Sequence, residues 1–139
     1  MVEGLENLNE ELAKQNEWAK AVIFDHEGHP VASKGFNVNP AELLPYLHAL
    51  DSRDATIGAG FILAGNHFDV HRFHPPLVYG RRGGPDEGEG IALCQAIRNG
   101  QPVYGVITYE FPYLSARCVP QLVDFCRKYI GTVEIPQPN

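Results

Sequence analysis

Two apolar runs flank the dipeptide Asn99-Gly100. They are GIALCQAI (90–97) and PVYGVITYE (102–110). Asn-Gly readily adopts the positive φ angles of a two-residue hairpin turn, so these runs predict two long antiparallel strands. A chain with this feature has to build an antiparallel sheet, and its other segments must be arranged around that sheet.

Further short apolar runs predict the rest of the sheet. AKAVIFD (19–25) and PVASKGF (30–36) lie on either side of the glycine-containing turn HEGH, a pattern typical of a hairpin. In GAGFILAGNHFDVHRF (58–73), apolar residues alternate on both sides of a turn at 64–66, which predicts a second hairpin. PLVYG (76–80) adds another strand.

Helical patterns occur near both ends of the chain. Leu5, Leu8 and Leu12 recur at intervals of three and four residues, so we expect an amphipathic helix that ends near Trp18. In VPQLVDFCRKYI (119–130) the apolar side chains share one helical face, and we expect a closing helix that starts at Pro120.

A third, short helix is expected between the two hairpins. Asn39 is placed to cap it and Pro40 to occupy its first position, while Pro45 limits its length. The resulting order of helices and strands predicts an α+β fold, an antiparallel sheet with terminal helices packed on it. At 139 residues, we expect a single domain spanning residues 1–139, with 136–139 as a short tail.

Charge and cysteine content exclude several classes of protein. The net charge of −6 opposes binding to nucleic acid, and no apolar run approaches the roughly 20 residues that span a bilayer. The acidic N-terminus does not resemble a secretory signal, and three cysteines without CxxC spacing argue against a disulfide framework. We therefore expect a cytoplasmic protein that is not an integral membrane protein.

Four residues of the strand at 67–74 are candidate metal ligands. His67, Asp69 and His71 would share one face of the strand, with His74 close by. The same alternation is typical of a half-exposed strand, and structural zinc normally has four ligands of cleaner spacing. A solvated face is therefore the favoured interpretation, and no metal is predicted.

No motif predicts an enzyme or a cofactor. The glycine-rich stretch YGRRGGPDEGEG (79–90) lacks the spacing of a phosphate-binding loop, and the chain has no GxSxG motif. Arg72, Arg81 and Arg82 lie on or near one edge of the predicted sheet, where they could steer an acidic protein partner or a phosphorylated ligand. Scattered solubilising arginines are the alternative.

An ordered set of motifs resembles the profilins, which are small actin-monomer-binding proteins. The similar segments are AKAVIFDHEGHPVASKGFNVNPAE (19–42), GFILAGNHFDVHR (60–72), VYGRRG (78–83) and the closing helix with KYI (128–130). The resemblance implies a central antiparallel sheet with N- and C-terminal helices on one face and a short helix on the other. It also implies binding to monomeric actin, regulation of actin polymerisation and of actin nucleotide exchange, phosphoinositide binding, and a place at the cytoskeleton.

The same resemblance assigns an actin-binding site residue by residue. Arg72 falls on the actin-contacting arginine of the family, and Arg81 and Arg82 match the basic pair of the following turn. The other positions implied to face actin are His67, where many profilins carry lysine, Gln121, Asp124, and Pro120, which replaces a commonly polar residue.

The polyproline site that the resemblance implies is degenerate in this chain. Profilins usually clamp a polyproline helix between aromatic side chains. Leu5 and Leu8 stand where a tryptophan and a tyrosine are expected, Val31 stands near the usual strand tryptophan, and Ile135 stands near the terminal aromatic residue. Only Tyr129 keeps a ring, so we predict weak or absent binding to proline-rich proteins.

The residues also leave open a second class of function. A small sensor or scaffold domain of similar sheet topology could bind a small ligand or a metal through its histidine-rich face, residues 67–74.

Overall fold

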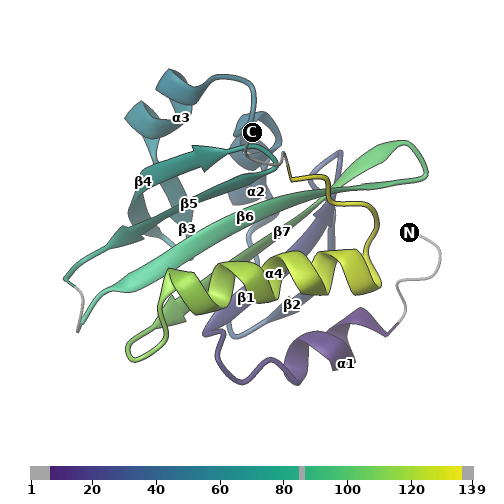
Figure 1. Ribbon diagram of the computed structural model, residues 1–139, viewed down its shortest axis with the longest axis horizontal. Helices are drawn as coiled ribbons and strands as arrows, with labels where there is room; N and C mark the ends of the chain where they lie inside the picture. The colour runs from purple at the N-terminus through teal and green to yellow at the C-terminus, as the bar shows by residue number, and fades with distance from the viewer. Residues whose placement is uncertain (1–6, 85–86, 136–139) are drawn as a thin grey trace.

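One antiparallel sheet forms the centre of the computed structural model, which describes residues 7–84 and 87–135 (Figure 1). Its strands, in the described part of the chain, are β1 (Lys20–Asp25), β2 (Pro30–Lys34), β3 (Phe61–Leu63), β4 (Asn66–His74), β5 (Leu77–Arg82), β6 (Glu89–Arg98) and β7 (Gln101–Glu110). They lie in the order β2-β1-β7-β6-β5-β4-β3. The predicted α+β class is confirmed.

The central hairpin follows from its turn residues. β6 and β7 pair continuously from Glu89↔Glu110 to Arg98↔Gln101, and Asn99 and Gly100 have φ angles of 52° and 79°. Ala64 and Gly65 join β3 to β4 with the same pair of angles. Because Asn-Gly tolerates these angles without strain, the central hairpin was predictable from its dipeptide alone.

Helices cover the two faces of the sheet separately (Figure 1). α1 (Leu8–Ala13) and α4 (Ser115–Tyr129) pack on one face, where their apolar side chains share a buried cluster with Ile23 and Ile107. α2 (Pro40–Leu43), the 3₁₀ helix η1 (Leu44–His48) and α3 (Arg53–Ala59) occupy the other, and Leu43 and Tyr46 join a second cluster there. This arrangement is the one that the resemblance implied.

The first helix ends earlier than predicted, at Ala13 rather than near Trp18. Its last turn tightens, because the amides of Lys14 and Gln15 donate to carbonyls three residues earlier. The chain then bends so that the Trp18 ring, only 2% exposed, enters the core beneath α4. Leu5, the first residue of the predicted stripe, lies outside the described residues.

The segment between the first two hairpins contains three short helices rather than the one that was predicted. Asn39 caps α2 as expected, its side chain accepting from the amide of Ala41 at 3.1 Å. Pro45 lies in η1, and α3 then starts from a separate cap, Ser52, whose hydroxyl accepts from the amide of Ala55 at 3.2 Å. The prediction of one short helix limited by Pro45 fits α2, but it did not include η1 or α3.

α4 begins at Ser115, so the predicted start at Pro120 is wrong. Proline lacks an N–H group, and inside a helix it leaves the carbonyl four residues earlier without its usual donor. Pro120 and Ala116 are both exposed, so water can reach that carbonyl. Burial of Cys118, Val119 and Leu122 against the sheet outweighs the loss of one hydrogen bond.

Two sequence-based expectations concern disulfides and membranes. Cys94, Cys118 and Cys126 are all buried free thiols, in line with the expectation of no disulfide framework, and burial raises the pKa of Cys118 to about 11. No helix within residues 7–84 and 87–135 is long and apolar enough to cross a bilayer.

Candidate functional site

A β-bulge in β4 determines where Arg72 points. Val70 pairs with Gly80 and Arg72 pairs with Tyr79, so His71 is an extra residue on the β4 side. Strict alternation would have put Arg72 on the same face as Phe68 and Val70. The bulge instead brings His71 and Arg72 together on the α4 side of the sheet, where they line one hollow with Tyr79.

The two arginines of β5 lie on opposite faces of the sheet. Arg81 lines the same hollow as Arg72 and donates to the carbonyl of Gly84 at 3.2 Å. Arg82 lies on the α2–α3 face, with its guanidinium 5.6 Å from the ring centre of Phe68. Because successive side chains of a strand alternate, a basic pair in sequence cannot act as a pair in space here.

Arg82 belongs to a buried ionic cluster. Its Nε and Nη2 donate to Oε1 of Glu89 at 3.1 and 2.9 Å, and Nζ of Lys20 donates to Oε2 at 2.8 Å. Glu89 is 1% exposed, and burial alone would raise its pKa. The hydrogen bonds from Lys20 and Arg82 and the charge of Lys20 outweigh burial and lower the pKa of Glu89 below its ordinary value.

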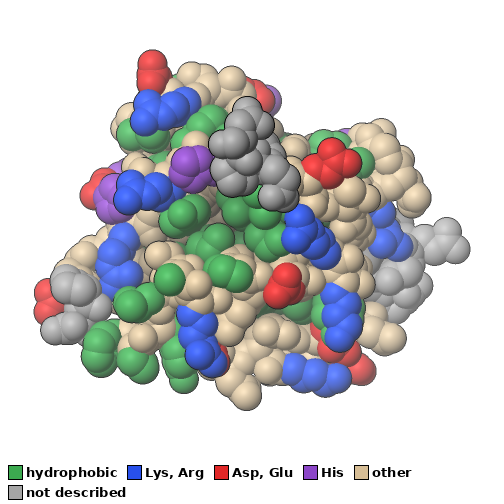
Figure 2. Space-filling view, viewed as in Figure 1, with side chains coloured by type: hydrophobic (Ala, Val, Ile, Leu, Met, Phe, Trp, Pro, Cys, Tyr) green, Lys and Arg blue, Asp and Glu red, His purple; other side chains and the backbone are tan. Residues whose placement is uncertain are grey.

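Two hollows lie side by side along the edge of α4 that faces β5. The first, of about 290 Å³, is lined by His71, Arg72, Tyr79, Gly80, Arg81, Tyr109 and Ser115. The second, of about 250 Å³, is lined by Leu77, Val119, Pro120, Val123, Asp124, Arg127 and Ile135. We refer to the residues of both hollows, apart from Ile135, as the β5–α4 surface. In Figure 2, apolar side chains occupy the middle of this face, with basic side chains around them.

The β5–α4 surface contains four of the seven residues assigned to actin by resemblance, namely Arg72, Arg81, Pro120 and Asp124. Gln121 lies on the α1 side of α4, where it accepts from the Trp18 indole at 3.0 Å and donates to Glu17 at 3.1 Å. His67 lies at the other end of β4, with Nε2 2.9 Å from the carbonyl oxygen of Ala59. Arg82 is on the opposite face.

The groove between α1 and α4 is occupied by its own side chains. The rings of Trp18 and Phe125 meet edge to face with their centroids 5.5 Å apart, and the ring centroids of Phe125 and Tyr129 are 4.8 Å apart. Trp18 and Phe125 are almost fully buried, at 2% and 4% exposure. The Tyr129 hydroxyl donates to Glu11 at 3.0 Å, which lowers the pKa of that carboxylate, and Lys128 lies over the Tyr129 ring.

The remaining residues assigned to polyproline binding are dispersed. Leu8 is buried in the core, and Val31 packs against the same cluster from β2. Ile135 lies on the other side of α4 from Tyr129, in the hollow that contains Leu77. The position of Leu5 is outside the described residues.

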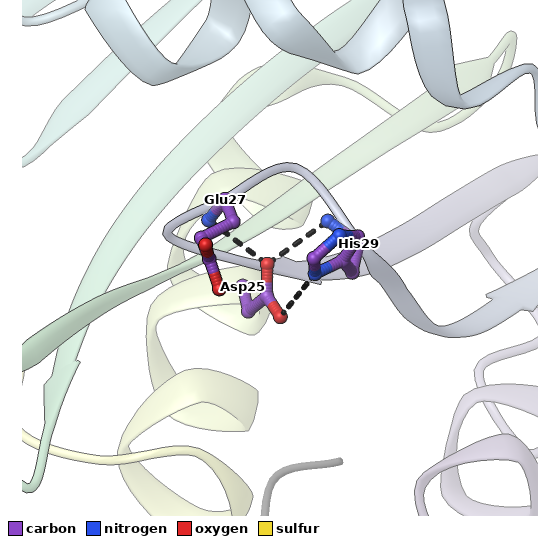
Figure 3. Close-up of side chains that lie close together, drawn as sticks. All are labelled: Asp25, Glu27 and His29. Atoms are coloured by element: carbon purple, nitrogen blue, oxygen red, sulfur yellow. Dashed lines mark hydrogen bonds and ion pairs between the residues drawn. The ribbon is translucent and has the colours of Figure 1, made fainter.

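The histidines of β4 do not form a metal-binding group. Within residues 7–84 and 87–135, three ligand atoms come within 4.8 Å of one another only at Asp25, Glu27 and His29, in the turn between β1 and β2. Figure 3 shows that the Asp25 carboxylate accepts from the amides of Glu27 and His29, both at 2.9 Å. Burial would raise the pKa of Asp25, but these two amides lower it, so the cluster is accounted for by the turn.

A comparison with family models identifies the fold. The model described as Profilin matches residues 5–98, more than half of the 139-residue chain. This chain belongs to the profilin family. Profilins are non-enzymatic, in agreement with the prediction that this protein is not an enzyme. Among curated protein sequences, none matches this profilin significantly.

Solved profilin structures have the same fold. Acanthamoeba castellanii profilin II is 23% identical, with 87% of this chain and 94% of that chain covered and a TM-score of 0.69. Schizosaccharomyces pombe profilin is 22% identical, with 90% and 97% covered and a TM-score of 0.69. LokiProfilin1, crystallised with rabbit actin, is 13% identical, with 92% and 95% covered and a TM-score of 0.68. At such identities, the likeness establishes the fold.

Sequence reasoning missed several residues of the β5–α4 surface in this profilin. Leu77 and Tyr79 alternate with the predicted Arg81 along β5 and therefore share its face, a signal that was present in PLVYGRR (76–82). Ser115 and Val119 were missed because the helix was expected to start at Pro120. The contribution of His71 could not have been found from alternation, since it depends on the bulge.

Proposed function

We propose that this profilin binds monomeric actin through its β5–α4 surface. Membership of the profilin family supports actin as the partner, and a profilin of the same fold, LokiProfilin1, was crystallised with rabbit actin. The observation that carries the proposal is the composition of the surface, in which Leu77, Tyr79 and Pro120 lie between arginines. On this proposal the protein works in the cytoplasm, where it regulates actin polymerisation.

The apolar side chains and the arginines of this surface contribute to binding in different ways. Stable protein complexes usually bury about 1,200–2,000 Å² in total, so the apolar middle of the surface has to supply much of the contact area. Exposed charges mainly set the association rate and the salt dependence. Arg72 and Arg81 are the steering charges, whereas Arg82 stays with Glu89 on the far side of the sheet.

Charge reversal at Arg72 tests the docking surface. Arg72→Glu is expected to weaken binding to rabbit actin by about tenfold or more, mostly through slower association, and to reduce the salt dependence. Arg53→Glu is the matched control, since Arg53 is exposed on α3 at the opposite face and pairs only weakly with Asp54 at 3.5 Å. Stopped-flow and equilibrium titrations with fluorescent monomeric actin measure both quantities.

Two results would contradict the proposal in different ways. If the wild-type protein failed to bind actin at about 100 μM, actin would not be the partner. If the wild type bound and Arg72→Glu and Arg53→Glu behaved alike, the docking surface would be elsewhere.

Weak binding to proline-rich ligands is the second part of the proposal. It is supported by the burial of Trp18 and Phe125 and by the contacts of Tyr129 with Glu11 and Lys128. A polyproline helix gains most when prolines stack on open aromatic faces, and this groove offers few of them.

A further inference from the structure

The chain turns back on itself after α4. The amides of Ile130 and Gly131 both donate to the carbonyl of Cys126, at 2.9 and 3.0 Å, which ends the helix. Thr132 then pairs with Ile97 of β6 through two backbone hydrogen bonds of 2.8 and 2.9 Å. In Figure 1 this segment, yellow, runs from the end of α4 back across the sheet. We call residues 132–135 the C-terminal strap.

The first half of the strap is firmly anchored. The guanidinium of Arg127 donates from Nε and Nη2 to the carbonyl of Val133, at 3.1 and 3.0 Å. Val133 itself is 4% exposed and belongs to the core on the α4 face. Because Thr132 and Val133 are held by backbone pairing, a guanidinium fork and burial, displacing the strap costs least at Glu134 and Ile135.

The second half of the strap covers part of the β5–α4 surface. Ile135 packs against the core and lines the same hollow as Leu77, Val119 and Val123. These three side chains are less than 9% exposed. They belong to the core between the sheet and α4, and Ile135 occupies part of the hollow above them that a docking protein could enter.

Glu134 adds an electrostatic effect in the same place. It is exposed and lines the neighbouring hollow with Pro76, Gln95 and Thr132. A partner attracted by Arg72 and Arg81 presents negative charge, and a carboxylate beside the docking surface repels such a partner.

We propose that the C-terminal strap is an intramolecular competitor that limits actin binding at the β5–α4 surface. This inference rests on the proposed function. Actin has to displace Glu134 and Ile135 before it reaches Leu77 and Val119, so the observed affinity is reduced by the fraction of molecules in which the strap is closed. The strap therefore sets how tightly this profilin holds a monomer.

Two substitutions in the full chain separate the apolar and the charged contributions. Ile135→Ser weakens the closed strap and is expected to raise the affinity for monomeric rabbit actin about three- to tenfold. Glu134→Lys is expected to accelerate association, with a larger gain at low salt. Ile62→Ser is the control for loss of an exposed isoleucine that lies outside the β5–α4 surface, on β3, and Glu10→Lys is the control for the same change of net charge at α1.

The outcomes distinguish the strap from the proposed function. Tighter binding by Ile135→Ser, with Ile62→Ser unchanged and circular dichroism showing that both are folded, would support the strap. If the wild type bound actin and Ile135→Ser bound equally or more weakly, the strap would not compete and the inference would be wrong, although the function would stand. If no variant bound actin, both would be overturned.

Discussion

Glu89 is the residue whose surroundings make the clearest prediction for stability. It is almost fully buried between Lys20 and Arg82, which are themselves 20% and 39% exposed. Removing one partner of a buried ionic cluster leaves the others poorly compensated. Since both cations still reach water, we expect Glu89→Gln to lower the free energy of unfolding by about 2 kcal/mol, measured by urea denaturation at neutral pH.

The pH dependence of this effect has a definite sign. The pKa of Glu89 is lowered in the folded protein, so its stabilising contribution is present above the ordinary value of 4.5 and is lost as the pH falls through the folded pKa. The difference in the free energy of unfolding between wild type and Glu89→Gln should therefore become smaller below pH 4.5. Glu10→Gln, at an exposed position of α1, should show no comparable difference in the free energy of unfolding. A difference between wild type and Glu89→Gln that became larger in acid would contradict this account.

Among the elements, the β4–β5 pair depends most on a single small residue. A Cβ atom added at Gly80 would lie 1.8 Å from the carbonyl oxygen of Asp69 and 2.7 Å from the Cα of Val70. The strands would have to separate beside the bulge that positions His71 and Arg72. We expect Gly80→Ala to lower the free energy of unfolding by at least about 2 kcal/mol and to weaken actin binding, measured by urea denaturation and titration.

The control for this substitution lies in α3. A Cβ atom at Gly58 meets no other atom within 4 Å, and alanine is the better helix former. Gly58→Ala should therefore stabilise the protein slightly, by about 0.5–1 kcal/mol. If Gly80→Ala and Gly58→Ala lowered the free energy of unfolding by similar amounts, Gly80 would not be needed for the close approach of β4 and β5.

The elements that the sequence predicted well are those specified locally. Asn99-Gly100 determines its turn without help from the rest of the chain, and Asn39-Pro40 determines a helix start in the same way. Neither the last residue of α1, Ala13, nor the first residue of α4, Ser115, could be predicted from local sequence. The first depends on burying Trp18, and the second on an apolar face that compensates for Pro120 inside the helix.

The candidate site shows the same limit. Resemblance gave Arg72 and Arg81 their roles, but only the bulge at His71 explains how both reach one surface. The separation of Arg82 from Arg81 follows from simple alternation and could have been predicted. Gln121 lies apart from the other residues assigned to actin, and Ile135 lies apart from Tyr129. Both positions depend on how α4 packs between α1 and β5, which no local pattern encodes.

At the scale of the whole molecule, α4 separates two surfaces with different properties. On its β5 side lie open hollows with arginines, and on its α1 side lies a groove filled by Trp18, Phe125 and Tyr129. A ligand for the first surface finds exposed area, whereas a polyproline helix on the second would have to displace the molecule's own contacts. Rearranging buried rings costs binding free energy before any proline stacks.

This difference predicts how the protein behaves with two ligands in one experiment. Calorimetric titration with decaproline should show a Kd weaker than about 1 mM, while the same sample binds monomeric actin. A profilin with an intact aromatic groove, titrated in parallel, shows that the peptide is competent. Decaproline affinity comparable to that profilin would contradict the prediction, because it would mean that Tyr129 becomes available despite its hydrogen bond to Glu11 and that the groove opens at little cost.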